Sequence, residues 1–332
     1  NVPLHAAEHY YLVTEPIEGI HRDLPVLNDS ARFAYYREET GGVMIGLFEP
    51  VAAPWGMDGI PEGFKFDDLP PDWDRMMPYL ECAMKRIPVA ETAGIHKFFC
   101  GPESFTPDLE PLMGEAPELK NYYVAAGFNS LGILLGGGVG QVMAQWMVDG
   151  LPPIDITEVD IARMLPFQNN PRYLRDRTVE LLGLMYAPGY FNLQAKTARS
   201  VRKSPFHDRL AEAGAYFGSY AGWEYADWFA PEGVEPEVEY TWGRQNWFEY
   251  AAAEHRAARE GVILMDYSVM GKLLVQGRDA EKALNRICAN NVAVPVGRCV
   301  YTQWLNERGR IEADLTVTRL AEDQFLVLTG DG

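Results

Sequence analysis

The run GFNSLGILLGGGVGQ, residues 127–141, constrains the fold of this chain more than any other segment. It follows the strand-like run NYYVAAG and leads into an apolar segment of helix length. A dinucleotide-binding fold places G-x-G-x-x-G at a strand-to-helix turn, with an acidic residue about 20 positions further on. The glycines at 136, 137, 138 and 140 do not keep that spacing, and the pattern occurs nowhere else in the chain. The run therefore predicts a strand, a loop and a helix, but not the opening of a dinucleotide-binding domain.

The helix is expected to run from about Ser130 to Met147, with Asn129 or Ser130 as its N-cap. Backbone N–H groups and the positive helix end would then point outward, toward an anion or a ring that gains negative charge. The glycines would let a strand or a flat ligand approach the backbone. A helix packed tightly on a sheet fits the same residues, so the physics leaves both interpretations open.

Length and charge exclude several classes of protein. A chain of 332 residues has room for about two domains. Its net charge of -18, with no Lys/Arg-rich run, would repel a polyanion, so we expect no nucleic-acid partner. The longest apolar run, Leu131 to Val148, is interrupted by glutamines and glycines and predicts a buried helix, not a membrane span.

The four cysteines, at positions 82, 100, 288 and 299, form no C-x-x-C pair, and the histidines have no metal-site spacing. We therefore expect no metal, and a reducing compartment. The chain opens with Asn1, shows no targeting segment, and stops at Leu-Thr-Gly-Asp-Gly just after a strand-like run. We expect that both ends are cut from a longer protein.

The first half of the chain alternates strand-like runs with a helix. HYYLVTE, RFAYYRE and GGVMIGLFE are rich in aromatic or β-branched residues and are bounded by turn formers, which predicts an antiparallel sheet. Residues 73–86 follow Pro-Pro-Asp and have apolar residues at helical spacing, so they predict a helix. Strands are also expected at IHKFFCG and NYYVAAG, with a polar loop, PESFTPDLEPLMGEAPELK, between them.

The second half begins after a mixed, largely helical segment, residues 151–204, in which we place the domain boundary near residue 160. The predicted domains are thus 1–160 and 161–332. A helix is expected over residues 247–259. The later runs VILMDYS, GKLLVQG, CVYTQWLN, EADLTVTRL and QFLVLTG alternate as strands of an antiparallel sheet do.

Specific motifs resemble a known family. The run from Cys100 to Gln141 closely resembles sarcosine dehydrogenase and dimethylglycine dehydrogenase, flavoproteins of the D-amino-acid-oxidase-like superfamily. HYYLVTEPIEGI and YYREETGGVMIGLFEP resemble the substrate-domain strands of that family. SPFHDRL, AGWEYADWF and CVYTQWLNERGRIEADLTVTRL resemble its C-terminal half, which is similar to the folate-binding aminomethyltransferase of glycine cleavage.

The resemblance implies a multidomain α/β and α+β fold. It would comprise the C-terminal part of a D-amino-acid-oxidase-like FAD and substrate domain, with an antiparallel sheet, followed by the start of an aminomethyltransferase-like folate-binding domain. It also implies that the glycine run is the second half of a flavin site whose first half lies upstream of Asn1.

Cofactor-binding residues follow from the same resemblance. Five would lie at the pyrimidine side of the isoalloxazine, where a helix N-terminus stabilises the anion of the reduced flavin: Gly127, Asn129, Ser130, Gly132 and Ile133. Thr106 and Pro107, in SFTPD, match a family loop near the flavin. Without the resemblance, an ordinary Thr-Pro-Asp turn fits these residues better.

Three residues are expected to be catalytic: His9 and Tyr35 in the first half of the chain and Asp314 in the second. A lone histidine in a strand is more often structural, but the resemblance implies that His9 faces the flavin. Tyr35 matches a tyrosine of the family. An imidazole or phenol can keep the substrate amine neutral, which hydride loss from the adjacent carbon requires. Arg37 shares a face with Tyr35 by strand alternation and fits either a carboxylate clamp or a surface ion pair.

Asp314, in the second half, resembles the aspartate that aminomethyltransferases place beside the folate nitrogen, where it can relay a proton. The family usually has Asn-x-x-Gly-Gly just before it, whereas this chain has Arg310 at the second glycine. Arg310 requires an ordinary φ, so the resemblance does not establish the geometry of this loop.

The resemblance implies an FAD-dependent amine dehydrogenase or oxidase that removes an N-methyl group from sarcosine or dimethylglycine and passes the carbon to tetrahydrofolate. Electrons would pass to an electron-transfer flavoprotein or to oxygen. The location would be the mitochondrial matrix in a eukaryote and the cytoplasm in a bacterium. Two alternatives stay open: a non-catalytic regulatory subunit of pyruvate dehydrogenase phosphatase with the same architecture, and a folate-binding module without flavin chemistry. His9 with Tyr35 favours the enzyme over the first, and the 127–132 loop argues against the second.

Overall fold

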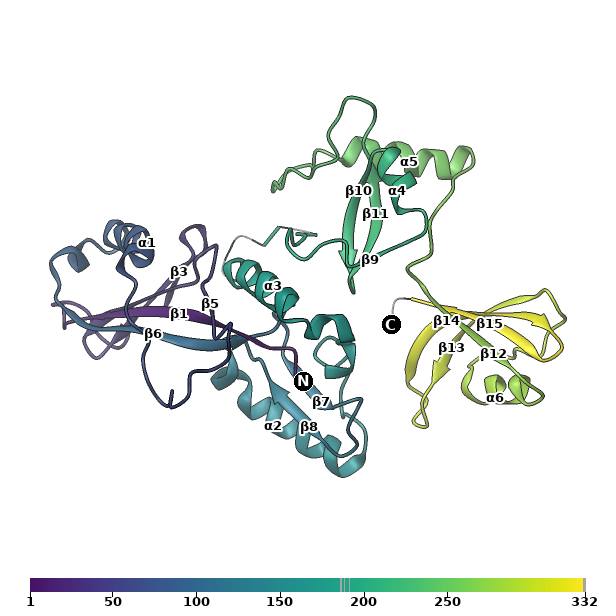
Figure 1. The fold of residues 1–332 in the computed structure, drawn as a ribbon, viewed down its shortest axis with the longest axis horizontal. Helices are drawn as coiled ribbons and strands as arrows, with labels where there is room; N and C mark the ends of the chain where they lie inside the picture. Colours follow the sequence, from purple (N-terminus) through teal and green to yellow (C-terminus); the bar gives the residue numbers. More distant parts are fainter. Residues whose placement is uncertain (186, 188, 191, 331–332) are drawn as a thin grey trace. The chain divides into compact units, whose positions relative to one another are not determined.

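The computed structural model describes residues 1–185, 187, 189–190 and 192–330. The chain divides into two compact units, Asn1–Arg199 and Ser200–Gly332, which are described separately (Figure 1). The division falls inside the 151–204 segment, further along than the residue 160 at which we placed the boundary. Helix α3 (Pro171–Leu184) belongs to the first unit because Leu182 is buried there beside Ala7 and Phe48.

A six-stranded sheet forms the centre of the first unit. β1 pairs with β4 and β5 along one edge and with β6 along the other, β3 joins β4, and β2 joins β3; all of these pairings are antiparallel. Its strands are β1 (His5–Thr14), β2 (Leu27–Asp29), β3 (Ala34–Glu39), β4 (Gly42–Leu47), β5 (Pro54–Trp55) and β6 (Ile95–Phe105).

Helix α1 (Trp73–Arg86) covers one face of this sheet, with the bounds that the sequence predicted. The Asp72 carboxylate caps it by accepting from the backbone N–H of Arg75 at 3.0 Å. Met76 and Ala83 pack among the strand residues that alternate toward the helix, including Tyr10 and Tyr36. Since strand side chains alternate between faces, His9 and Tyr35 lie on the face of the sheet away from α1.

A second layer of the first unit contains a two-stranded ribbon, β7 (Leu112–Glu115) and β8 (Tyr123–Ala126), and helix α2 (Gly132–Asp149). Met113 on β7 packs with Met143 and Trp146 of α2. The helix ends at Gly150, which has a left-handed φ of 74°. Four short 3-10 helices complete the unit: Ser30–Arg32, Pro88–Thr92, Ile161–Arg163 and Pro166–Asn169.

The second unit has two sheets. The first has the order β10-β11-β9 and the second has the order β12-β15-β14-β13. Residues of α6 and the second sheet form a core that includes Leu284, Leu315 and Phe325. The elements are β9 (Arg202–Lys203), α4 (His207–Glu212), β10 (Ala215–Tyr220), β11 (Trp223–Phe229), α5 (Phe248–Glu260), β12 (Gly271–Gln276), α6 (Ala280–Ile287), β13 (Cys299–Leu305), β14 (Ile311–Ala321) and β15 (Gln324–Thr329).

One predicted strand does not form. VILMDYS, residues 262–268, has no regular structure, and Val262 and Leu264 are almost fully exposed. A strand needs a neighbour for its backbone hydrogen bonds. Here the Asp266 carboxylate instead accepts from the Ser204 hydroxyl and from the backbone N–H of Ser268, which turns the chain. Alternation alone was therefore a misleading signal in this segment.

Within the described part of the chain, no helix combines the length and apolarity that crossing a membrane requires. Helix α2 has the length, but its glycines and glutamines lower its hydropathy.

Candidate active site

His9 lies on β1 with its ring held on two sides. Its Nδ1 is 2.7 Å from Oε2 of Glu103, and its ring centroid is 4.3 Å from that of Phe48. The side chain is 14% exposed. Its other nitrogen, Nε2, is buried and has no hydrogen-bond partner among the described residues. A buried polar atom without a partner is costly, so this nitrogen is suited to a group that the chain itself does not supply.

Tyr35 lies on the same side of the sheet. It is paired with Gly46, and its ring covers that glycine so closely that a Cβ there would lie 2.0 Å from the tyrosine Cζ. Its ring centroid is 6.2 Å from that of Phe48. Because both His9 and Tyr35 have their rings beside Phe48, the structure brings the two predicted catalytic residues of the first unit together.

Arg37 does not take the clamp position that we considered for it. Its guanidinium is half exposed and donates to Glu39 at 2.6 Å. Of the two alternatives that the sequence left open, the surface ion pair is the one that the structure contains.

Two predicted flavin loops, residues 106–107 and 127–130, meet in the structure. The Asn129 Oδ1 accepts from the backbone N–H of Thr106 at 3.0 Å, and its Nδ2 lies 3.1 Å from the Thr106 hydroxyl. Both residues are buried. Gly127 has a φ of 65°, and a Cβ there would be 2.5 Å from the Thr106 Cγ2. Only glycine fits so close to the neighbouring loop. Pro107, next to Thr106, is buried as well.

Helix α2 begins later than predicted. Asn129 and Ser130 have φ values of 48° and 66°, and the N-cap is Leu131, whose side chain makes no capping bond. Asn129 is not a cap because its side chain is committed to Thr106. Gly132 and Ile133 form the exposed first turn, so the first N–H groups of the helix have no side-chain cap.

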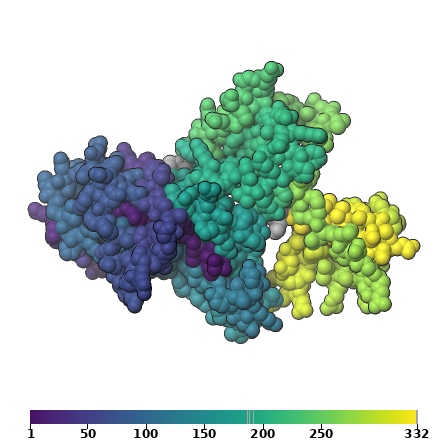
Figure 2. Space-filling view, in the orientation of Figure 1, coloured from purple at the N-terminus to yellow at the C-terminus, as the bar shows by residue number. Residues whose placement is uncertain are grey.

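The glycine row of α2 is open. Apart from the neighbouring backbone of the helix itself, a Cβ at positions 136, 137, 138 or 140 would meet no atom of the described chain within 4 Å. Ile133 is fully exposed, and the helix lies at the surface of its unit (Figure 2). The described residues therefore place no strand against these glycines.

Glu103 was missed by the sequence analysis. Its Oε2 accepts from the Ser130 hydroxyl at 2.6 Å as well as from His9. Burial works to raise the pKa of this carboxyl, but the hydrogen bonds from His9 and Ser130 hold it below its usual value. We predicted that the strand ends at Gly101, whereas β6 continues through Pro102 to Phe105. Proline is tolerated there because β6 is an edge strand, which pairs only with β1 among the described residues.

A second carboxyl that the sequence analysis missed, that of Glu49, is buried next to this site. In the sequence it is distinguished only by its position after an apolar run. Glu49 is 3% exposed and its Oε1 is 3.5 Å from Nη1 of Arg75. Burial raises its pKa to about 7, although Arg75 and His9 act in the opposite direction. Arg75 also contacts Glu8, which accepts from the Tyr10 hydroxyl.

Asp314 lies on β14 of the second unit, exposed and opposite Gln303 of β13. The Gln303 amide donates to Asp314 at 3.1 Å, and hydrogen bonds from Tyr301 and Gln303 lower the pKa of the aspartate. The turn before Asp314 is stabilised by the side chain of Asn306. Its Oδ1 accepts from the backbone N–H groups of Arg308 and Arg310. The left-handed residue is Gly309, with a φ of 72°, so Arg310 keeps an ordinary φ as expected.

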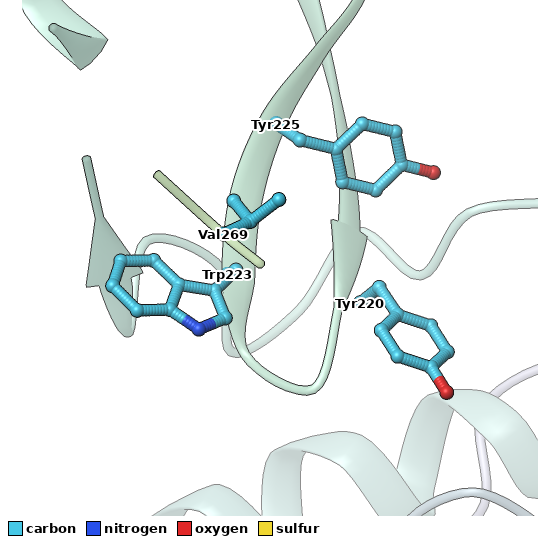
Figure 3. A pocket seen from close by; sticks show the side chains of 4 residues that line it. All are labelled: Tyr220, Trp223, Tyr225 and Val269. Carbon is cyan, nitrogen blue, oxygen red and sulfur yellow. The ribbon is translucent and has the colours of Figure 1, made fainter. Parts of the chain in front are cut away.

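A separate hollow in the second unit lies beside the β10–β11 hairpin (Figure 3). Its volume is about 300 Å³, and it is lined by Tyr220, Trp223, Tyr225 and Val269. The guanidinium of Arg202 lies 4.3 Å from the Trp223 ring. These residues make an apolar, aromatic surface without a carboxylate or imidazole for acid–base work. Over the described residues, no group of three or more His, Cys, Asp or Glu side chains could hold a metal ion.

The residues of the first unit fit a planar group that becomes anionic. They offer an unpartnered imidazole nitrogen, a glycine turn and a helix start whose N–H groups have no side-chain cap. Three known family models match the chain, and two of them describe FAD-dependent oxidoreductases. Residues 1–146 match the FAD dependent oxidoreductase family, residues 149–204 match the FAD dependent oxidoreductase central domain, and residues 206–332 match the GCVT N-terminal domain.

The chain is similar to three enzymes named as oxidases or dehydrogenases and to one regulatory subunit. The chain is 43% identical to 4-methylaminobutanoate oxidase (formaldehyde-forming) of Paenarthrobacter nicotinovorans, over 99% of this chain and 40% of that protein. It is 36% identical to human mitochondrial sarcosine dehydrogenase, over 96% and 37%. It is 34% identical to the mouse pyruvate dehydrogenase phosphatase regulatory subunit, over 99% and 38%. Rat dimethylglycine dehydrogenase matches at 32%.

The fold and these matches define a flavin-dependent oxidoreductase part joined to a GCVT domain. The chain is homologous to sarcosine dehydrogenase, dimethylglycine dehydrogenase and 4-methylaminobutanoate oxidase, which confirms the resemblance seen in its motifs. It spans about two fifths of the length of these relatives.

Proposed function

We propose that this chain is part of an FAD-dependent enzyme that oxidises an N-methyl amino acid and passes the one-carbon unit to tetrahydrofolate. The observation that carries the proposal is the buried, unpartnered Nε2 of His9, on the sheet face that it shares with Tyr35. FAD, when bound, would accept the hydride. Sarcosine, dimethylglycine and 4-methylaminobutanoate are the substrates to test, following the names of the relatives.

The residues of this chain would prepare the amine for oxidation. A protonated amine has no lone pair to expel hydride from its methyl carbon, so a base must take its proton. His9 Nε2 has the free acceptor, and the Tyr35 phenol is the second polar group on that face. Gly127, Asn129, Ser130, Gly132 and Ile133, with Thr106 and Pro107, would border the flavin ring, where the α2 N-terminus favours negative charge.

Asp314 would act separately, in the folate-binding part. Its carboxylate is ionised at neutral pH and can accept a proton as the one-carbon unit is captured. Electrons would pass to an electron-transfer flavoprotein or to oxygen. We propose the mitochondrial matrix as the location in a eukaryote and the cytoplasm in a bacterium.

The rival function is that of a non-catalytic regulatory subunit, and its support is the 34% identity to the mouse pyruvate dehydrogenase phosphatase regulatory subunit. The experiment uses the full-length protein: its visible spectrum is recorded without oxygen, and each amine is then added. Bleaching of the flavin band supports the enzyme. His9→Ala should slow this bleaching by about 10²-fold, while His96→Ala, at an exposed histidine of β6, should not. A bound flavin that none of the amines reduces supports the regulatory subunit.

A further inference from the structure

One oxygen of Glu103 joins two predicted functional residues from different segments. Its Oε2 is 2.7 Å from Nδ1 of His9 on β1 and 2.6 Å from the hydroxyl of Ser130, in the loop before α2. The backbone N–H of Ser130 also stabilises this carboxylate. Glu103 is thus shared between the imidazole and the flavin-side loop.

This contact determines which nitrogen of His9 carries the proton. An ionised carboxylate only accepts hydrogen bonds, so the Nδ1 that faces Glu103 must be the N–H nitrogen. In the neutral ring Nε2 then has the lone pair. Because the ring also lies against Phe48, with centroids 4.3 Å apart, the direction of this lone pair is fixed.

The other charged and titratable groups near His9 are few. Glu49, after β4, interacts electrostatically with His9, and Arg75 of α1 lies 3.5 Å from Glu49. Tyr35 on β3 contributes a phenol to the same face. Glu103 is therefore the carboxylate in direct contact with the imidazole.

We propose that Glu103 is the positioning residue that holds His9 as its Nδ1–H tautomer, ready to take a proton from the substrate ammonium, and that Ser130 couples it to the flavin-side loop. The proposal rests on the function proposed above. In this step an N–H bond of the ammonium breaks, its electron pair stays on nitrogen, and the proton bonds to Nε2. Nothing is oxidised or reduced, and Glu103 balances the charge of the imidazolium.

The test uses full-length holoenzyme with Glu103→Gln, which keeps the shape and removes the charge. The imidazole becomes a weaker base, so the rate of flavin reduction should fall about tenfold near neutral pH. At high pH the amine loses its proton to water and the rate should recover. A purely structural role would lower the rate equally at all pH values. The matched control is Glu15→Gln, which breaks the exposed His96–Glu15 pair between the same two strand segments.

A second readout needs no turnover. We would titrate the visible spectrum of the resting enzyme with pH, because a charge on His9 beside the flavin changes its absorption. Removing the carboxylate should move the transition to lower pH, and Ser130→Ala, which leaves Glu103 charged, should move it less. An unshifted transition together with a pH-independent rate defect would overturn the role of Glu103. If the unmodified enzyme is not reduced by any amine, the proposed function itself fails.

Discussion

Asn129 and Thr106 form a closed, buried pair in which each side chain satisfies the other. The pair joins two loops that are 23 residues apart, and Asn129 also holds a left-handed φ of 48° that asparagine tolerates better than most residues. The position of the 127–130 loop therefore depends on one amide group.

We expect Asn129→Ala to lower the free energy of unfolding by about 1–3 kcal/mol, because it leaves the buried Thr106 N–H and hydroxyl without partners. It should also weaken FAD retention in the full-length protein. Urea unfolding and flavin release on dialysis measure the two effects. Asn121→Ala is the matched control, since Asn121 has a similar φ of 63° but is exposed. Equal losses in the two variants would show that only the backbone conformation matters.

Two glycines of the opening motif should respond oppositely to alanine. Gly127→Ala would place a methyl group 2.5 Å from the Thr106 Cγ2 at a positive φ, so we expect destabilisation by more than about 1 kcal/mol. Gly137→Ala meets nothing and improves helix propensity, which should stabilise this chain by about 1 kcal/mol. Thermal unfolding of the two variants checks the signs, and a tolerant Gly127 would contradict the close approach of the loops.

Glu49 should make stability depend on pH. Its folded pKa of about 7 lies above its ordinary value of 4.5, so the folded state binds the extra proton. Its contribution is complete below about pH 4.5 and is lost as the pH rises toward and past 7, by about 3 kcal/mol at most. Glu49→Gln should thus gain stability relative to the unmodified protein between about pH 5 and 8. Denaturant midpoints of the variant and the unmodified protein, measured at about pH 5 and about pH 8, test this. A stability difference between the two proteins that stays constant with pH would argue against a raised pKa.

Asp314→Asn should separate the two proposed chemical steps. Asp314 lies in the GCVT part, so flavin reduction by the amine should keep its rate. Capture of the carbon by tetrahydrofolate should fail, and formaldehyde should appear instead. The ratio of formaldehyde to methylene-tetrahydrofolate measures the split. An unchanged ratio would remove Asp314 from the folate chemistry.

Much of the fold could be predicted because its signals are local. Helix α1 follows from the Asp72 cap and a regular apolar spacing, and β1, β3 and β4 follow from alternation. The failures have a shared cause, which is that the deciding partner is distant in sequence. Asn129 gives up the helix cap for Thr106, 23 residues away, and Asp266 turns a strand-like run by bonding Ser204, 62 residues away.

In the candidate site, too, the residues with a local motif could be predicted and the residue that depends on distant partners could not. His9, Tyr35 and the 127–130 loop were identified by their motifs. Glu103 was not, because its importance comes from lying beside β1 in register and from reaching Ser130. Nothing in the local pattern around Glu103 distinguishes it from the other acidic residues of a polar segment.

The open glycine row of α2 has a consequence for how this sequence can vary. Where side chains are missing, the helix presents its own backbone, so a covering polypeptide could approach to main-chain contact. A methyl group at positions 136–138 or 140 would not disturb the atoms around it in the described chain. Alanine at these four positions should therefore leave the first unit folded, while it would limit how closely a covering segment can approach the helix backbone.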